Sequence, residues 1–251
     1  GRKETLLLII QFSHWLYLEM NMGRNMIITD RFIFWHLPKC AGTTTRNILS
    51  TAFKNEIIFD SSREPGMVFH QQDIPQQFTN DKERDWIINF RKLPAFLLSK
   101  TNHTYREMIY NFNERIDPAK CKELYLEGYT YQREREITAD EVLEPYQYIF
   151  DNPNTKIIRQ EHYKDDLIKV LKEYNYDLPY TLAIAEPESG YQGATETLGD
   201  AQHISSLVKH GQGKEMKLLK KIDLDKNQLI KIQQTNPKWT DLERRLYHDN
   251  N

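Results

Sequence analysis

Short apolar runs and amphipathic stretches alternate along most of the chain. Runs that are rich in aromatic and β-branched residues and lack a helical period are typical of buried strands. Such runs are found at 31–36, 56–60, 86–90 and 155–159, with a weaker one at 66–70. The pattern therefore predicts a sheet of several short strands.

Between and after these runs, apolar residues recur at helical spacing, and Pro94 fits the first turn of one such stretch. The expected helices are 46–53, 94–112, 165–174, 200–209, 214–221, 224–235 and 238–248. Strands that alternate with helices predict an α/β fold of three layers, α/β/α, with a central parallel sheet and a helical C-terminal third. In such sheets ligands bind at the carboxyl ends of the strands, so candidate chemistry is sought in the loops at that edge.

Two segments stand outside this alternation. Residues 6–18 are apolar, but they carry polar interruptions and are shorter than the roughly 20 residues of a membrane span. We interpret residues 1–25 as an N-terminal apolar helix or extension, buried or docked on a partner, with a remnant of a membrane anchor as the alternative. Residues 113–146 are charged and tyrosine-rich, which predicts a helical insertion. We expect residues 1–251 to form a single domain.

The composition is that of a globular protein, with 39% hydrophobic and 28% charged residues. The 34 Lys and Arg residues nearly balance the 36 Asp and Glu residues, and the net charge of −2 argues against a dedicated nucleic-acid-binding protein. The two cysteines, Cys40 and Cys121, are too few for a disulfide framework or a four-ligand zinc site, and the histidines show no metal-ligand spacing. We expect free thiols, no bound metal, and a reducing, cytoplasmic (bacterial-type) compartment rather than the Golgi lumen.

The turn after the first apolar run carries the clearest candidate chemistry. From His36 to Thr45 it reads HLPKCAGTTT, between an expected strand and an expected helix. The backbone N–H groups of such a turn point at one spot, and the helix dipole adds positive potential, which together make an anion site. Lys39 adds a full charge, the threonine hydroxyls add donors, and Gly42 allows close approach of the backbone. An ordinary strand–turn–helix with a solvent-facing lysine is the alternative.

The order of residues in this turn differs from that of a Walker A loop. A Walker A loop reads G-x-x-x-x-G-K-[ST], whereas here Lys39 precedes Gly42 and no lysine follows the glycine. This order argues against an ATP or GTP hydrolase.

The segment PKCAGTTT, from Pro38 to Thr45, resembles the 5′-phosphosulfate-binding loop of sulfotransferases that use 3′-phosphoadenosine 5′-phosphosulfate (PAPS). A histidine two residues before the proline is typical of the carbohydrate sulfotransferase branch. The family also places an arginine at the end of a later strand and a serine eight residues on, the spacing of Arg91 and Ser99. Two further stretches, 158–167 and 241–247, are similar to the family's strand–Glu–aromatic–helix segment and to its terminal "D…LY" helix.

The resemblance implies a P-loop-like fold and transfer of a sulfuryl group from PAPS to an acceptor hydroxyl, most naturally that of a sugar. It implies that Arg91 and Ser99 bind the 3′-phosphate, and that Lys39 also stabilises the leaving oxygen. The residues that the resemblance assigns to the 5′ end of the nucleotide are Lys39, Cys40, Ala41, Gly42, Thr43, Thr44 and Thr45. The implied partners are the nucleotide donor and the hydroxyl acceptor, without a nucleic acid and without a metal.

A base must accept the proton of the acceptor hydroxyl. In the family this is a histidine or an acid near the end of the strand before the 3′-phosphate strand. His70 ends a short apolar run, and its ordinary pKa near 6.5 suits proton uptake at neutral pH, so we expect it to be the base. Asp73 and Glu64 are the alternatives.

Two other functions compete with this interpretation. An ATP-dependent small-molecule kinase of the P-loop type would need magnesium for turnover. A non-catalytic nucleotide-binding module would bind the 3′,5′-bisphosphate of adenosine without any turnover.

Overall fold

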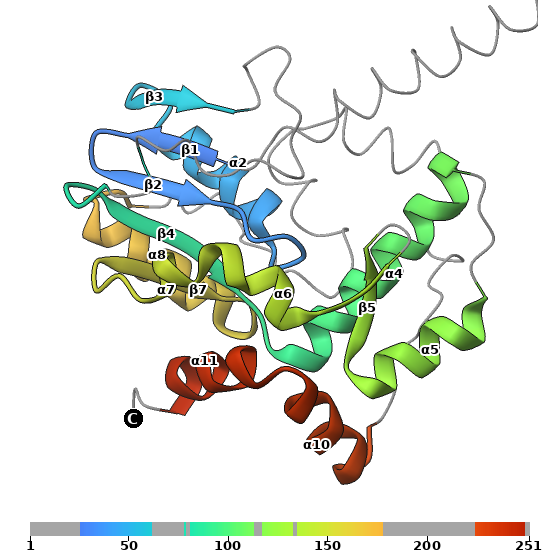
Figure 1. Cartoon of the computed structure of the whole chain (residues 1–251). Coiled ribbons are helices and arrows are strands. Elements are labelled where there is room, and N and C mark those ends of the chain that lie inside the picture. Colours follow the sequence, from blue (N-terminus) through green and yellow to red (C-terminus); the bar gives the residue numbers. More distant parts are fainter. Residues whose placement is uncertain are drawn as a thin grey trace, which may run out of the picture.

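Figure 1 shows the computed structural model of the chain. The structure describes residues 26–61, 78, 81–112, 117–132, 135–177 and 224–248. Several predicted segments lie outside the described residues: the N-terminal segment 1–25, the weaker strand at 66–70 and the helices at 200–209 and 214–221.

A five-stranded sheet forms the centre of the described structure, so the α/β expectation is confirmed. Its strands lie in the order β3 (Ile57–Asp60), β1 (Met26–Thr29), β2 (Phe32–Trp35), β4 (Asp85–Phe90) and β7 (Thr155–Arg159). Strands β2, β4 and β7 are parallel, whereas β1 is antiparallel to both β2 and β3. The prediction of a parallel sheet is therefore wrong at β1, which runs against the other four strands, and the sheet is mixed.

The mixed sheet follows from a strand that the sequence pattern did not predict. β1 is fully buried and is joined to β2 by only two residues, and so short a connection pairs strands antiparallel. The hydroxyl of Thr29 fixes this turn, because it accepts from the N–H of Phe32 at 3.0 Å and from the N–H of Arg31 at 3.2 Å.

Helices cover one side of the sheet at its centre. Successive residues of a strand face opposite sides, and Ile27 and Ile87 face the side of α2 (Gly42–Ala52) and α8 (Tyr163–Glu173). Both helices present buried apolar residues to this cluster. Figure 1 shows α2 beside β1 and β2, and α8 beside β4 and β7.

The other side of the sheet is covered by α4 (Leu93–Phe112) and α11 (Pro237–His248). Trp86 and Phe90 of β4 face this cluster, in which the ring of Trp239 stacks on that of Phe90 with centroids 5.1 Å apart. The helices expected at 94–112, 165–174, 224–235 and 238–248 are thus confirmed within a residue or two. The elements η1 (Glu144–Tyr146), α7 (Gln147–Phe150) and α10 (Lys226–Thr235) also contribute residues to this cluster. The short η2 (Gln160–His162) follows β7 in the chain.

The insertion expected to be helical contains a hairpin as well. The structure has α5 (Pro118–Glu127), β5 (Tyr129–Gln132), β6 (Arg135–Thr138) and α6 (Ala139–Leu143) in this segment, and β5 and β6 form a separate antiparallel sheet. Gly128 ends α5 at φ +89°, where an added Cβ would lie within 3.2 Å of residues of α10 and its end. A purely helical insertion is therefore wrong, since this glycine turns the chain into the hairpin.

Among the described helices, no helix is both long and apolar enough to cross a membrane.

Candidate functional site

The loop between β2 and α2 lies at the carboxyl edge of the three parallel strands. Because β2, β4 and β7 run in the same direction, the segments that follow Trp35, Phe90 and Arg159 meet at one edge of the sheet. These three segments are the loop predicted from the sequence, the Arg91–Lys92 turn and η2.

The backbone of this loop has an uncommon conformation. Lys39 and Ala41 adopt φ values of +63° and +65°, although neither is glycine, whereas Cys40 between them does not have a positive φ. Such residues cost roughly 1–2 kcal/mol each, and they cluster at functional sites. Alternation of right- and left-handed residues turns successive N–H groups to one side, which makes a concavity for an anion.

Helix α2 begins immediately after this turn. Its N-cap residue is Ala41, and no side chain caps the helix from that position. The first N–H groups of a helix have no acceptor within the helix, and here the backbone bonding starts with the N–H of Thr45, which donates to the carbonyl of Ala41 at 3.3 Å. Within the turn the N–H of Cys40 donates to the carbonyl of Leu37 at 3.4 Å, so the donors that this segment offers to a ligand come mainly from the first turn of α2.

A glycine is required at position 42 because the ring of His36 lies directly beside it. A Cβ at this position would lie 1.9 Å from the Cδ2 atom of His36, far inside van der Waals contact. The predicted close approach at Gly42 is thus to a ring of the protein, and that ring packs directly against the first turn of α2.

The three threonines of the loop differ in their surroundings. Thr43 and Thr44 are half-buried, whereas Thr45 is completely buried. The hydroxyl of Thr45 contacts the carbonyl of Ala41 at 3.4 Å and the hydroxyl of Tyr163 at 3.0 Å. It also accepts a hydrogen bond from Nδ2 of Asn89 at 2.9 Å.

Cys40 is a packing residue of the loop. Its side chain is completely buried, and burial raises the pKa of the thiol well above its ordinary value, although nearby Arg91 and Lys39 act in the opposite direction. Cys121 is likewise free and buried, and burial raises its pKa to about 11. Neither thiol forms a thiolate at neutral pH.

Arg91 lies against the loop. It is only 9% exposed, and its Nη1 atom donates to the carbonyl of Lys39 at 3.3 Å. Its own carbonyl accepts from the indole N–H of Trp239 at 3.1 Å. The structure thus brings the Arg91 guanidinium to the backbone of Lys39, although the resemblance assigns these two residues to opposite ends of the ligand.

Ser99 lies further into α4. It is half-buried, six residues after Leu93, which places it about 9 Å along the helix from its first residue. The eight-residue spacing from Arg91 leads from the strand end into this helix, and the shared contact with a 3′-phosphate stays a prediction.

Two glutamates at the β4–α4 turn were not singled out from the sequence. Glu161 accepts from the N–H of Lys92 at 3.1 Å, and Glu243 accepts from the N–H of Leu93 at 2.8 Å. Tyr247 donates its hydroxyl to Glu161. The stretches 158–167 and 241–247, noted for their resemblance, each deliver one of these glutamates to the same helix start, where carboxylates are favoured by the helix dipole.

The predicted catalytic bases His70, Asp73 and Glu64 lie outside the described residues. Within the parts of the chain that the structure describes, no group of three or more His, Cys, Asp and Glu side chains could hold a metal ion.

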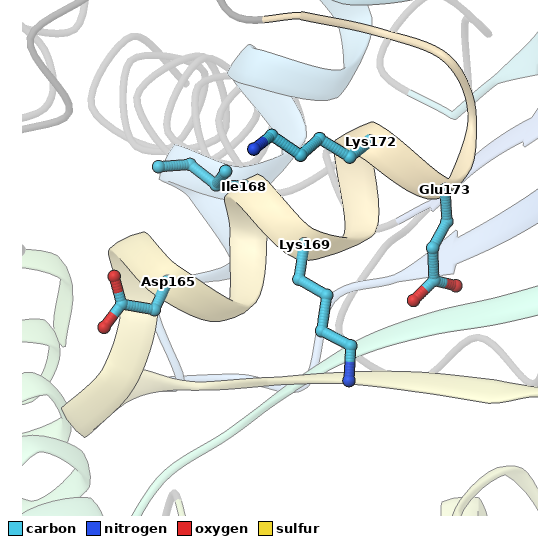
Figure 2. Close-up of a pocket in the computed structure, with 5 residues that line it drawn as sticks. All are labelled: Asp165, Ile168, Lys169, Lys172 and Glu173. Atoms are coloured by element: carbon cyan, nitrogen blue, oxygen red, sulfur yellow. The ribbon is translucent and has the colours of Figure 1, made fainter.

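A surface hollow of about 510 Å³ lies along α8. It is lined by Asp165, Ile168, Lys169, Lys172 and Glu173. All five come from this one helix and, as Figure 2 shows, they extend to different sides of it. No residue of the β2–α2 loop belongs to this hollow, so it adds nothing to the site described above.

No protein-family model matches the chain, and no curated protein or solved structure matches it either.

Proposed function

We propose that the protein is a PAPS-dependent sulfotransferase, which transfers a sulfuryl group to a hydroxyl of a carbohydrate or glycoconjugate. The observation that carries this proposal is the left-handed turn at Lys39 and Ala41, which leads without a side-chain cap into α2. The same segment has the sequence that resembles the family's 5′-phosphosulfate loop. A loop of N–H donors with Lys39 and Arg91 beside it fits a ligand with anionic groups.

The P-loop-like, three-layer arrangement is part of this proposal. Buried clusters on both sides of the sheet and the parallel pairing of β2 with β4 support it. The cytoplasmic location is also part of it, supported by two free, buried thiols.

The reaction joins the acceptor oxygen to sulfur and breaks the bond from sulfur to the bridging 5′-phosphate oxygen. The acceptor proton goes to a base, which we propose is His70, with Asp73 and Glu64 as alternatives. Adenosine 3′,5′-bisphosphate leaves with one more negative charge on the bridging oxygen. Lys39 and the N–H groups of the loop stabilise this charge, since fixed donors aimed at developing charge lower the barrier.

Thermal unfolding in the presence of ligands tests the proposal. Adenosine 3′,5′-bisphosphate without a metal should stabilise the protein, by about 2.7 kcal/mol at a concentration of 100 times Kd. Sulfuryl transfer to a panel of sugars is then measured through the release of the bisphosphate. Stabilisation by ATP only in the presence of magnesium would favour the kinase instead. Binding of the bisphosphate without transfer to any hydroxyl would favour the non-catalytic module.

A further inference from the structure

We propose that Asn89, Thr45 and Tyr163 are positioning residues that fix the direction of the loop's N–H groups toward the 5′-phosphate of the nucleotide. This inference rests on the proposed function. The three residues come from β4, the first turn of α2 and the first turn of α8, and they meet in the core beneath the loop.

The hydrogen bonds of this trio meet at the hydroxyl of Thr45. The amide nitrogen of Asn89 can only donate, so Thr45 is its acceptor. The hydroxyl of Tyr163 can donate or accept, whereas the carbonyl of Ala41 can only accept, so we assign the single proton of the Thr45 hydroxyl to this carbonyl. With this assignment Tyr163 donates to Thr45. The Thr45 hydroxyl therefore has no proton left for a ligand, and it acts on the loop rather than on the nucleotide.

The target of these bonds is the peptide group that starts α2. The carbonyl of Ala41 receives both the hydroxyl and the backbone N–H of Thr45. Because a peptide group is planar and trans, this carbonyl and the N–H of Gly42 point in opposite directions. Holding the carbonyl along α2 thus holds the Gly42 N–H toward the open N-terminal end of this helix, where the phosphate is proposed to bind.

The trio is also unusual as a core feature. Asn89 and Thr45 are completely buried and Tyr163 is 2% exposed. The other residues of β4 from Trp86 to Phe90 are apolar, and the Oδ1 atom of Asn89 has no hydrogen-bond partner among the described residues. An apolar side chain at position 89 would stabilise the sheet more than asparagine does, because a buried polar atom without a partner is destabilising. The bond from Asn89 to Thr45 is therefore its distinguishing contribution.

A matched pair of tyrosines separates positioning from stability. Tyr163 starts α8, whereas Tyr174 follows its end and donates its hydroxyl to Asp85 at 2.9 Å, at the opposite end of β4. Tyr163→Phe and Tyr174→Phe each remove one largely buried hydroxyl at an end of α8, the first from Thr45 of α2 and the second from Asp85 of β4. Both variants are compared for the melting temperature and, by calorimetry, for the Kd of adenosine 5′-phosphate and of adenosine 3′,5′-bisphosphate.

We expect Tyr163→Phe to raise Kd for both nucleotides by the same factor, roughly 3- to 10-fold, which is the range that one hydrogen bond corresponds to. Tyr174→Phe should lower the melting temperature similarly and leave both Kd values unchanged. In a second pair, Thr45→Val should reproduce the loss of affinity, whereas Thr45→Ser, which keeps the hydroxyl, should retain most of the affinity.

Three results would overturn the inference. The trio is only structural if Tyr163→Phe and Thr45→Val lower the melting temperature but keep the affinity of the wild-type protein. An effect on the bisphosphate alone would mean that the trio acts on the 3′ end of the nucleotide. A wild-type protein that binds neither nucleotide would refute the proposed function and this inference with it.

Discussion

Lys39 has a left-handed backbone, and so does Ala41 two residues later. Their turn therefore combines the charge of a lysine with N–H donors. Lys39 is the residue that we propose stabilises the leaving oxygen. Lys39→Ala should therefore lower kcat by about 10²- to 10³-fold, the loss typical of removing one charge-stabilising donor. Steady-state sulfuryl transfer measures it.

The matched control is Lys54→Ala, which makes the same change at an exposed lysine just beyond the other end of α2. That variant should keep the wild-type rate. Retention of the wild-type kcat in Lys39→Ala would remove Lys39 from the reaction.

The contact between Gly42 and His36 makes a second prediction at the scale of single residues. Gly42→Ala places a Cβ 1.9 Å from the His36 ring, so one of the two must shift. Overpacking of this kind costs about 1–3 kcal/mol of the free energy of unfolding. His36→Ala removes the ring, so the double variant should recover most of that loss, and urea unfolding of the four proteins measures the coupling. Additive effects of the two changes would contradict the contact.

At the scale of elements, the turn between β4 and α4 is held from two directions. Glu161 and Glu243 cap the start of α4, and Trp239 of α11 donates to the carbonyl of Arg91. Arg91 is thereby fixed at the carboxyl edge of the sheet, with its guanidinium on the carbonyl of Lys39.

Arg91→Ala distinguishes the two roles that this placement allows. If the guanidinium binds the 3′-phosphate, the variant should weaken binding of adenosine 3′,5′-bisphosphate far more than binding of adenosine 5′-phosphate, because only the first ligand carries that group. Calorimetric titration of both nucleotides measures the difference. An equal loss of affinity for both would show that Arg91 acts only through its contact with the loop.

The elements that the sequence predicts are those with a strong local pattern. The apolar runs that became β2, β4 and β7 and the amphipathic α8 were identified, and the loop was placed correctly between a strand and a helix. β1 has the same four-residue length as β2 but was missed because its sequence, MIIT, contains no aromatic residue. The partners of the loop were missed for another reason: Asn89 is 44 residues from Thr45, and Tyr163 is 118 residues from it. No local periodicity marks residues that meet only through the packing of three elements.

At the scale of the whole molecule, groups far apart in the sequence converge on one sheet edge. Glu243 is 150 residues from the Leu93 N–H that it caps, and Tyr247 is 86 residues from Glu161. The site is thus completed by the last described helix, so its integrity depends on the global fold, and global stability is relevant to its function.

Buried hydroxyls and a buried thiol make that stability sensitive to alkaline pH. Burial raises the pKa of Tyr163. Burial and the bond to Asp85 raise the pKa of Tyr174, and burial and the bond to Glu161 raise that of Tyr247. Burial also raises the pKa of the Cys40 thiol. In all four the folded protein holds the proton more tightly than the unfolded chain does.

The free energy of unfolding should therefore be at its full value below about pH 8 and should fall as the pH rises through about 9 to 11, where an unfolded cysteine and then an unfolded tyrosine ionise. Each group that stays protonated in the folded protein contributes a slope of about 1.4 kcal/mol per pH unit above its unfolded pKa. Urea unfolding at several values from about pH 8 to about pH 11 measures the slope. In Tyr174→Phe one such group is gone, so its slope above about pH 10 should be shallower by about that amount. A free energy of unfolding that is constant over this range, or an unchanged slope in the variant, would mean that these groups ionise as freely in the folded protein as in the unfolded chain.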